Sequence, residues 1–226
     1  MTVQSHGAKV PKPTYFNLKE SKRIAIEEAA TREFGAYGFY GARLNRIVAR
    51  AGIAKGSFYQ YFDNLEDLYF HLLELYANQK LALINEVLSK HDEADFFTQY
   101  RLICMASVSF IKSVSDDVLL MSEQMAPDHH RDTNVRDRFR RRKEEELFQP
   151  LIARAIEKGE INSDADFAFV VVTNITYMIQ QYLSRPAGVD SLGELLRKPR
   201  ELDHAIEVFI NFLKSGLTGQ FRDKEH

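Results

Sequence analysis

Hydrophobic residues recur along this chain at intervals of three and four positions, which is the spacing of one face of an α-helix. No sustained alternation of apolar and polar residues, the pattern of a strand, interrupts that spacing. The sequence therefore predicts an all-α fold. The predicted helices cover residues 17–38, 44–51, 54–61, 65–90, 95–114, 116–126, 130–158, 164–184 and 201–219.

These helices divide the chain into three predicted parts. Residues 1–16 have the composition of a flexible basic arm, and residues 17–64 form a module of three short helices. Residues 65–226 form a helical body that begins with a long connecting helix. Asp63 or Asn64 is placed to cap that connecting helix, because either side chain can accept a hydrogen bond from a backbone N–H of the first turn.

The first predicted helix has recognisable ends. Asn17 and Glu20 have the spacing of a capping box, which predicts a start near Asn17. Gly35 and Gly38 predict its end, because glycine readily adopts the left-handed conformation that often terminates a helix.

Charge is distributed unevenly between the parts, although the net charge is only −2. Residues 1–62 contain ten Lys and Arg against four Asp and Glu, whereas the rest of the chain contains twenty against twenty-eight. Chance clustering is one explanation. The other is a basic DNA-facing module attached to an acidic body, which produces this asymmetry.

Residues 44–62 contain the parts of a helix-turn-helix. Such a motif needs a short anchored helix, a tight turn and a second helix with small or polar residues facing outward. Gly52 lies between the two predicted helices and allows a left-handed turn at no steric cost. The apolar residues that would anchor the two helices are Leu44, Ile47, Val48, Ala51, Ile53, Phe58 and Phe62.

Four residues of the second helix are suited to reading bases. Gly56 and Ser57 have little bulk, so the helix can enter the major groove, which is about 12 Å wide. Lys55 can reach a guanine edge or a phosphate. Gln60 can read adenine or bond the DNA backbone.

Three further residues are suited to phosphate contacts. The hydroxyls of Tyr59 and Tyr61 can bond phosphate oxygens, which fixes the register on DNA without reading sequence. Arg43 can hold a phosphate near a helix N-terminus. For the tyrosines the alternative is a half-buried packing role with a solvated hydroxyl.

The stretch from Arg23 to Leu68 resembles the DNA-binding domain of TetR-family repressors. Its second half, residues 51–69, reads AGIAKGSFYQYFDNLEDLY and carries most of the resemblance. The resemblance implies a DNA-binding regulator whose C-terminal helices bind an effector and form a dimer. The matching positions in the first half are Ile26, Ala29, Ala30, Phe34, Gly38 and Phe39.

The chain departs from the family pattern at three places. Ala42 and Arg43 replace a Thr-Ser pair, Ala54 replaces a capping Ser, and Leu65 replaces a phosphate-binding Lys. Loss of a hydroxyl N-cap costs about 0.5–2 kcal/mol unless another group replaces it. DNA binding is therefore expected to rely more on Arg43, Lys55 and the basic residues of the arm and first helix. Those residues are Lys9, Lys12, Lys19, Lys22 and Arg23.

The body is rich in large apolar side chains, which form a helical core in the simplest interpretation. The resemblance implies that some of them line an effector pocket. Because few charged residues point inward, we expect a mainly apolar or amphipathic small molecule. The candidate pocket residues are Tyr100, Met105, Phe110, Met121, Met125, Phe148, Tyr177 and Met178.

The last two long helices, 164–184 and 201–219, resemble the pair that forms a four-helix dimer interface in this family. Each has a broader apolar face than one buried side requires, as expected of a homodimer. The candidate interface residues are Phe167, Val171, Ile175, Ile179, Tyr182, Phe209, Ile210, Leu213 and Leu217.

Other features predict no additional chemistry. The adjacent His129 and His130 lack metal-ligand spacing, and Cys104, the single cysteine, lies in an apolar run. We expect no metal, no cofactor and no catalytic residue, since no phosphate loop, nucleophile elbow or dinucleotide fingerprint occurs. The basic run at residues 136–143 precedes three glutamates. It is interpreted as a solvated helix face with i,i+4 ion pairs, the alternative being a second nucleic-acid patch.

Together these patterns predict a repressor that binds double-stranded DNA at a palindromic operator and is released by a small-molecule effector. The alternative is a ligand-independent DNA-binding protein that organises the chromosome or acts through a protein partner. The chain has no run of about 18 apolar residues and no secretory signal, so we expect a cytoplasmic protein without a membrane span.

Overall fold

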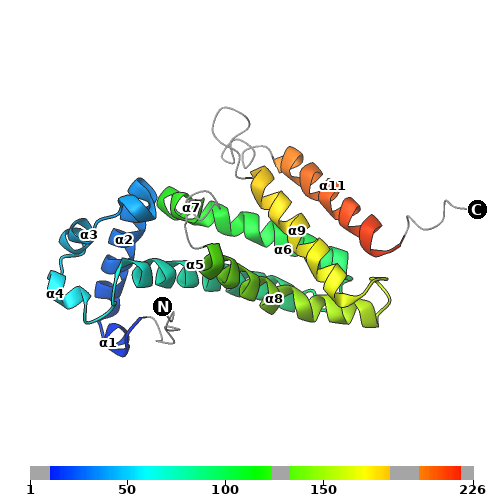
Figure 1. The fold of residues 1–226 in the computed structure, drawn as a ribbon. Helices are drawn as coiled ribbons and strands as arrows, with labels where there is room; N and C mark the ends of the chain where they lie inside the picture. The colour runs from blue at the N-terminus through cyan, green and yellow to red at the C-terminus, as the bar shows by residue number, and fades with distance from the viewer. Residues whose placement is uncertain (1–10, 124–132, 184–198, 220–226) are drawn as a thin grey trace, which may run out of the picture. The chain divides into compact units, whose positions relative to one another are not determined.

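The computed structural model describes residues 11–123, 133–183 and 199–219, with side chains for residues 11–121, 141–179 and 200–219. Within these ranges every regular element is a helix, which confirms the all-α fold (Figure 1). The helices are α1 Pro13–Phe16, α2 Glu20–Gly41, α3 Leu44–Ala51, α4 Lys55–Phe58, α5 Leu65–Ser89, α6 Phe96–Ser113, α7 Asp116–Glu123, α8 Thr133–Glu157, α9 Ala165–Leu183 and α11 Pro199–Leu217.

The helices form two compact units. The N-terminal unit comprises residues up to 79 together with α7, and the C-terminal unit comprises the end of α5, α6, α8, α9 and α11. Our assignment of DNA binding to residues 17–64 and of effector binding and dimerisation to residues 65–226 stays a prediction.

The expectation of a flexible arm is wrong for residues 13–16, because they form helix α1. Tyr15 is buried, and its ring packs against Phe62 and His71 at centroid distances of 5.1 and 5.0 Å. Burial of this aromatic ring offsets the entropy of ordering the segment. The expectation of a capping box at Asn17 and Glu20 is also wrong. Asn17 is the C-cap of α1, and α2 begins after Lys19, whose side chain makes no capping hydrogen bond.

The predicted end of the first helix is wrong at Gly35, which lies inside α2. An added Cβ at Gly35 would lie 2.7 Å from the carbonyl oxygen of Asp117, so this glycine lets the α7 backbone approach α2 closely. At Gly38, where φ is 69°, α2 has a kink, and the helix then continues to Gly41. Sequence periodicity does not reveal a partner helix such as α7, which follows α2 by some 75 residues.

The N-terminal unit has its own core, to which α2, α3, α4 and α5 contribute large, fully buried side chains. These residues are Ile26, Phe34, Ile47, Phe58 and Leu68. Asn64 caps α5, since its Oδ1 accepts the Asp67 N–H at 2.9 Å, as the sequence predicted for this pair of positions. The Asp67 carboxylate in turn accepts the Asp63 N–H at 3.0 Å, which holds the chain entering the helix.

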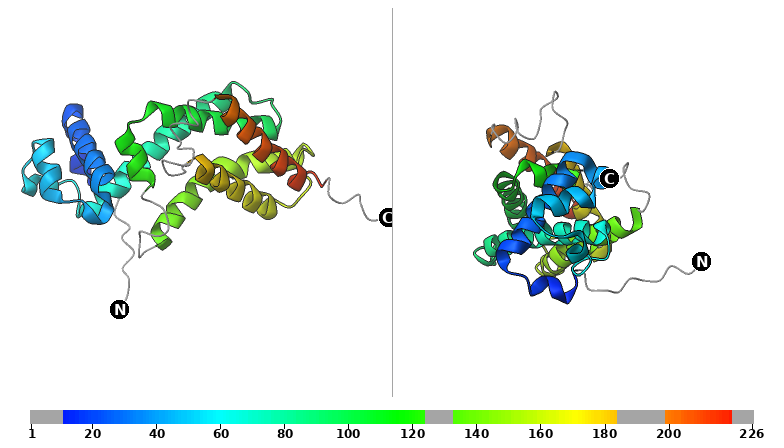
Figure 2. Two further views of the ribbon diagram at one scale, coloured as in Figure 1. Left: turned by 90° about the horizontal axis from the view of Figure 1, so that it is seen from above. Right: turned by 90° about the vertical axis from the view of Figure 1, so that its left-hand side faces the viewer.

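In the C-terminal unit, α6 and α9 each pack against both α8 and α11 (Figure 1, Figure 2). The end of α5 adds Ile84 to the core of these helices. Their inward faces form one hydrophobic core, which includes Tyr100, Phe148, Ile152, Val172 and Ile206.

Candidate nucleic-acid interface

Helices α3 and α4 form the predicted helix-turn-helix. Gly52 adopts the left-handed conformation, with φ 64° and ψ 34°, and ends α3. The Ile53 N–H then donates to the carbonyl of Val48 at 3.0 Å, which is the bond expected where a left-handed residue closes a helix. Helix α4 is only four residues long, shorter than the predicted 54–61, and Phe58 anchors it in the core. We call α4 and the turn that follows it, residues 55–61, the recognition segment.

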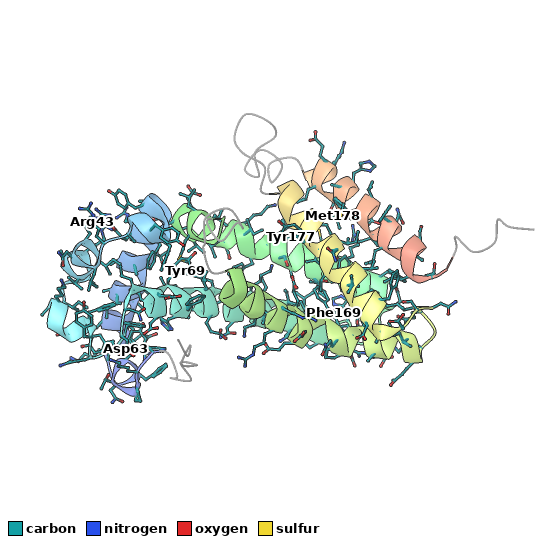
Figure 3. The ribbon with its side chains drawn as sticks, in the orientation of Figure 1. Arg43, Asp63, Tyr69, Phe169, Tyr177 and Met178 are labelled. Atoms are coloured by element: carbon teal, nitrogen blue, oxygen red, sulfur yellow. The ribbon has the colours of Figure 1, made fainter. Side chains whose placement is uncertain are left out.

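The recognition segment presents most of the predicted DNA-contact residues to solvent. Lys55, Gly56, Tyr59 and Gln60 are exposed, and Ser57 is half-buried. Arg43, at the start of α3, is also exposed (Figure 3).

Tyr61 was expected to face outward, and that expectation is wrong. Its side chain is only 5% exposed, and its ring packs edge-on against Tyr15 at a centroid distance of 6.3 Å. The turn after α4 directs this tyrosine toward α1, so it is a packing residue.

Helix α3 begins without a side-chain cap from its own N-cap residue, Arg43. The cap comes instead from α2, because the carboxylate of Glu33 accepts the Arg43 backbone N–H at 3.0 Å. Glu33 is fully buried, and the same oxygen accepts the Nε of Arg46 at 2.6 Å. This charge-assisted pair stands in for the missing Thr-Ser cap.

Arg46 holds the two helices together through several groups. One guanidinium nitrogen donates to the Gly41 carbonyl at 2.8 Å, and the guanidinium lies 4.1 Å from the ring centroid of Tyr37. The second Glu33 oxygen is buried without a hydrogen bond, and Arg50 lies 3.9 Å from it. Sequence reasoning missed Glu33, although a signal existed: it occupies the i+7 position of the apolar stripe that starts at Ile26.

The other end of the recognition segment is bonded by residues before α2. The Lys12 ammonium donates to the Tyr59 carbonyl at 2.9 Å, and the Lys12 N–H donates to the Tyr61 carbonyl at 2.9 Å. The Thr14 hydroxyl donates to the Gln60 carbonyl. We call Lys12 and Thr14 the N-terminal clamp.

The clamp is fixed by two further contacts. Lys12 forms an ion pair with Asp63, which follows the recognition segment. Asp63 is labelled in Figure 3. An Arg23 guanidinium nitrogen donates to the Phe16 carbonyl at 3.2 Å. From the sequence we expected Lys12 and Arg23 to belong to the basic surface available to DNA. Both side chains instead hydrogen-bond carbonyl groups of the protein itself.

Behind the clamp lies a partly buried polar group of three residues. The Tyr15 hydroxyl donates to Glu27 at 2.6 Å, and His71 of α5 lies 3.2 Å from the same carboxylate oxygen. Burial alone would raise the pKa of Glu27, but hydrogen bonds from His71 and Tyr15 outweigh it and lower that pKa below its ordinary value. Burial also raises the pKa of Tyr15, so the phenol stays protonated and acts as the donor.

The predicted pocket residues are not brought together as one set. Tyr100 and Phe148 share the core of the C-terminal unit, with ring centroids 6.0 Å apart, whereas Met121 is buried in the N-terminal unit. Met178 is an exposed residue of α9 (Figure 3). Met105, Phe110 and Tyr177 are half-buried, and Met125 lies outside the described residues.

Polar groups accompany Tyr100 in that core. Its hydroxyl lies 2.9 Å from the Thr176 hydroxyl, and it also hydrogen-bonds the Cys104 thiol. Burial raises the pKa of this thiol to about 12 and lowers the pKa of the nearby Lys80 ammonium. Lys80, a half-buried cation of α5, was not anticipated from the sequence.

The predicted dimer-interface residues divide between two sides of α9 and α11. Five of them are buried within the protomer core, which corrects their assignment: Ile175, Ile179, Ile210, Leu213 and Leu217. Val171 and Phe209 are partly buried against that core, Phe167 is exposed, and Tyr182 lies outside the described side chains. We call the exposed apolar residues of the two helices the outer face: Phe167, Val170, Met178, Val208 and Phe212.

The basic run forms the predicted ion pairs where its side chains are described. Arg141 bonds Glu145 at 3.0 Å and Arg142 bonds Glu146 at 3.2 Å, both at i,i+4 spacing. Residues 129 and 130 lie outside the described range, and the described side chains contain no cluster that could hold a metal ion. None of the helices in the described ranges is both long and apolar enough to cross a membrane.

Comparison with known proteins finds matches to the N-terminal region and to nearly the whole chain. Residues 26–72 match the family model described as bacterial regulatory proteins, tetR family. A TetR family transcriptional regulator from Chloroflexus aurantiacus is 26% identical, with a TM-score of 0.62 over 92% of this chain and 98% of that one. A search of curated protein sequences gives no match.

Two more distant solved structures share the fold. FadR from Bacillus subtilis, solved in complex with stearoyl-CoA, is 16% identical, with a TM-score of 0.63 over 86% of this chain and 98% of its own. The ketosteroid regulator KstR2 of Mycobacterium tuberculosis is 18% identical, with a TM-score of 0.55 over 89% and 97%. The matched chains are therefore covered almost completely.

Proposed function

Because this chain belongs to the tetR family of bacterial regulatory proteins, a family of DNA-binding transcription regulators, we propose that it is a ligand-responsive repressor. It acts as a homodimer on a palindromic operator, on chromosomal DNA in the cytoplasm. The observation that carries the proposal is the exposed recognition segment, in which Lys55, Gly56, Tyr59 and Gln60 face solvent beyond a left-handed turn at Gly52.

The assignment of contacts follows from exposure and chemistry. Lys55 and Gln60 carry donors that suit base edges, and Gly56 and Ser57 leave the groove floor accessible. Tyr59 and Arg43 bond phosphates and fix the register. Tyr61 is excluded from this set, because its ring is buried.

Homodimerisation is supported by the outer face. Its five apolar side chains are each about half exposed or more, up to 68% for Phe212. On α9, Phe167, Val170 and Met178 share one helical face, with the polar Asn174 between the last two. Burying two such faces against each other gives a two-fold symmetric dimer, and its two recognition segments then meet two half-sites.

The effector is proposed to bind in the interior of the C-terminal unit. Large aromatic residues such as Tyr100 and Phe148 suit the apolar part of a ligand. Lys80 and the hydroxyl of Thr176 suit its polar end, which makes an amphipathic molecule the better fit. FadR from Bacillus subtilis, which shares the fold, was solved with such a molecule, stearoyl-CoA. A ligand that prefers one conformation by about 1–3 kcal/mol would change DNA affinity roughly 5–150-fold.

The test is selection of bound sequences from a random pool of duplex DNA, followed by affinity measurements on the selected operator. We expect a palindrome, weaker binding by Lys55→Ala and Tyr59→Phe, and unchanged binding by Lys112→Ala, an exposed lysine of the C-terminal unit. Equal affinity of both recognition-segment variants and the parent would contradict the contact assignment. Recovery of many unrelated sequences would instead indicate a chromosome-organising protein.

A further inference from the structure

The recognition segment depends on other parts of the chain for its geometry. Helix α4 has a single turn, and its N-cap residue Ala54 makes no side-chain cap. The turn that follows α4 is held from outside, since three consecutive carbonyls there, those of Tyr59, Gln60 and Tyr61, each accept a hydrogen bond from the N-terminal clamp.

We propose that Lys12 and Thr14 are positioning residues for DNA recognition, which set the placement of Tyr59 and Gln60 on the operator. The inference rests on the proposed function. The clamp hydrogen-bonds the backbone carbonyls of Tyr59 and Gln60, whose side chains would face DNA. A displacement of the clamp would therefore also displace these two side chains relative to the bases. Hydrogen bonds to base edges weaken steeply with distance and angle, so a small displacement of Gln60 lowers specific affinity.

The Lys12 ammonium already takes part in contacts within the chain. Its ammonium donates to the Tyr59 carbonyl and pairs with Asp63, and a cation at a helix C-terminus is favoured by the helix dipole. This separates Lys12 from the exposed Lys19 and Lys22, whose ammonium groups are free of these contacts with the recognition segment. Lys12 is therefore expected to act through the recognition segment and not through a phosphate.

The clamp is held in place from behind. Tyr15, the residue after Thr14, is buried against Phe62 and bonds Glu27. The backbone of residues 12–14 is thus anchored on one side by a core aromatic and on the other by the recognition segment. This anchoring makes the clamp a fixed support.

The test compares Lys12→Met and Thr14→Val with Lys22→Met, which removes the same charge from an exposed site. Affinity is measured over a range of salt concentrations for the selected operator and for an unrelated duplex. We expect both clamp variants to lose about tenfold in operator affinity. Binding to the unrelated duplex should stay at the parent's level for both clamp variants. Lys22→Met, at an exposed lysine expected to face DNA, should instead weaken binding to both duplexes. Lys12→Arg, which keeps the cation and donor, should retain operator affinity.

Salt dependence separates positioning from direct contact. Loss of one phosphate contact lowers the slope of log affinity against log salt by about 1, and weakens both DNAs alike. A slope decrease of that size in Lys12→Met relative to the parent would overturn the proposal. So would unchanged operator affinity in both clamp variants.

Hydrogen exchange supplies a readout that does not depend on DNA. Amides of residues 58–62 should exchange faster in Thr14→Val than in the parent, while amides of α9 stay unchanged. Uniformly faster exchange would indicate general destabilisation and contradict a positioning role. If the parent selects no sequence, the proposed function fails, and exchange at these amides still decides whether the clamp fixes the recognition segment.

Discussion

The carboxylate of Glu33 accepts the backbone N–H of Arg43 at 3.0 Å, so a residue of α2 caps the first helix of the helix-turn-helix. The cap is not local, since ten residues separate the two partners. It explains how α3 starts without the hydroxyl residues that the family pattern usually places there. The same carboxylate bonds Arg46, so one buried charge fixes both the start of α3 and its contact with α2.

Glu33→Ala should therefore destabilise the N-terminal unit. It removes the acceptor for the Arg43 N–H and leaves Arg46 without its charged partner. We expect the free energy of unfolding to fall by about 2 kcal/mol, measured by urea unfolding. Glu28→Ala changes an exposed glutamate of the same helix and should alter that free energy by less than about 0.5 kcal/mol. Equal effects of the two substitutions would contradict the capping role.

Two glycine substitutions should have opposite consequences. In Gly35→Ala the new Cβ meets the Asp117 carbonyl oxygen at 2.7 Å, so α2 and α7 must separate, at a cost of about 1–3 kcal/mol. Gly56→Ala adds a Cβ with no neighbouring atom within 4 Å and should leave thermal stability unchanged or raised. On the proposed interface the same methyl group reduces operator affinity. Loss of stability in Gly56→Ala would show that the segment is packed more tightly than described.

Acid should remove the stabilisation that Glu27 provides. Its folded-state pKa lies below the ordinary value of 4.5, so the native protein binds fewer protons there than the unfolded chain. The contribution is complete above that ordinary value and is lost as pH falls through the folded-state pKa. In urea unfolding, the difference between the parent and Glu27→Gln should be fully present just above pH 4.5 and shrink toward pH 3. A difference independent of pH would contradict this, and exposed Glu20→Gln serves as the control.

The Cys104 thiol should be unreactive in the folded protein. Burial raises its pKa to about 12, so very little thiolate exists near pH 8, and the core also blocks access. A thiol reagent such as dithionitrobenzoate should label less than a tenth of the native chains in the time that labels unfolded chains completely. Because the chain has a single cysteine, complete labelling of the native protein would show that this core opens readily.

Substitutions on the outer face should dissociate the dimer. Phe212→Glu places a charge at the most exposed large apolar position of α11, and burying it in an interface without a partner is costly. We expect a monomer at micromolar concentration in analytical ultracentrifugation, with the helical content unchanged. Leu120→Glu alters an exposed apolar residue of α7 and should leave the parent's association state intact. A parent protein that is itself monomeric would refute the proposed dimer.

The helix-turn-helix was predictable because its signals are local. The spacing of Ile47, Val48 and Ala51 gives the inward face of α3, and Gly52 gives the turn. The supports of this motif were not predictable in the same way. Lys12 bonds a carbonyl 47 positions along the chain, and no periodicity relates two residues so far apart.

The C-terminal helices illustrate a different limit. Helix α9 is apolar on two sides, and the sequence pattern does not say which side meets the protomer core. Ile175 and Ile179 lie inside, whereas Phe167 and Met178 lie outside. From sequence alone, a residue such as Phe167 fits the protomer core and the outer face equally well. Only the positions of the neighbouring helices decide between the two.

Helix α4 owes its shape to groups that lie outside it, namely Gly52, the N-terminal clamp and the core contact of Phe58. The exposed residues Lys55 and Gln60 of the recognition segment therefore have little part in maintaining the fold. On the proposed function, exchange of Lys55 and Gln60 would therefore change the preferred DNA sequence and leave the free energy of unfolding nearly unaltered.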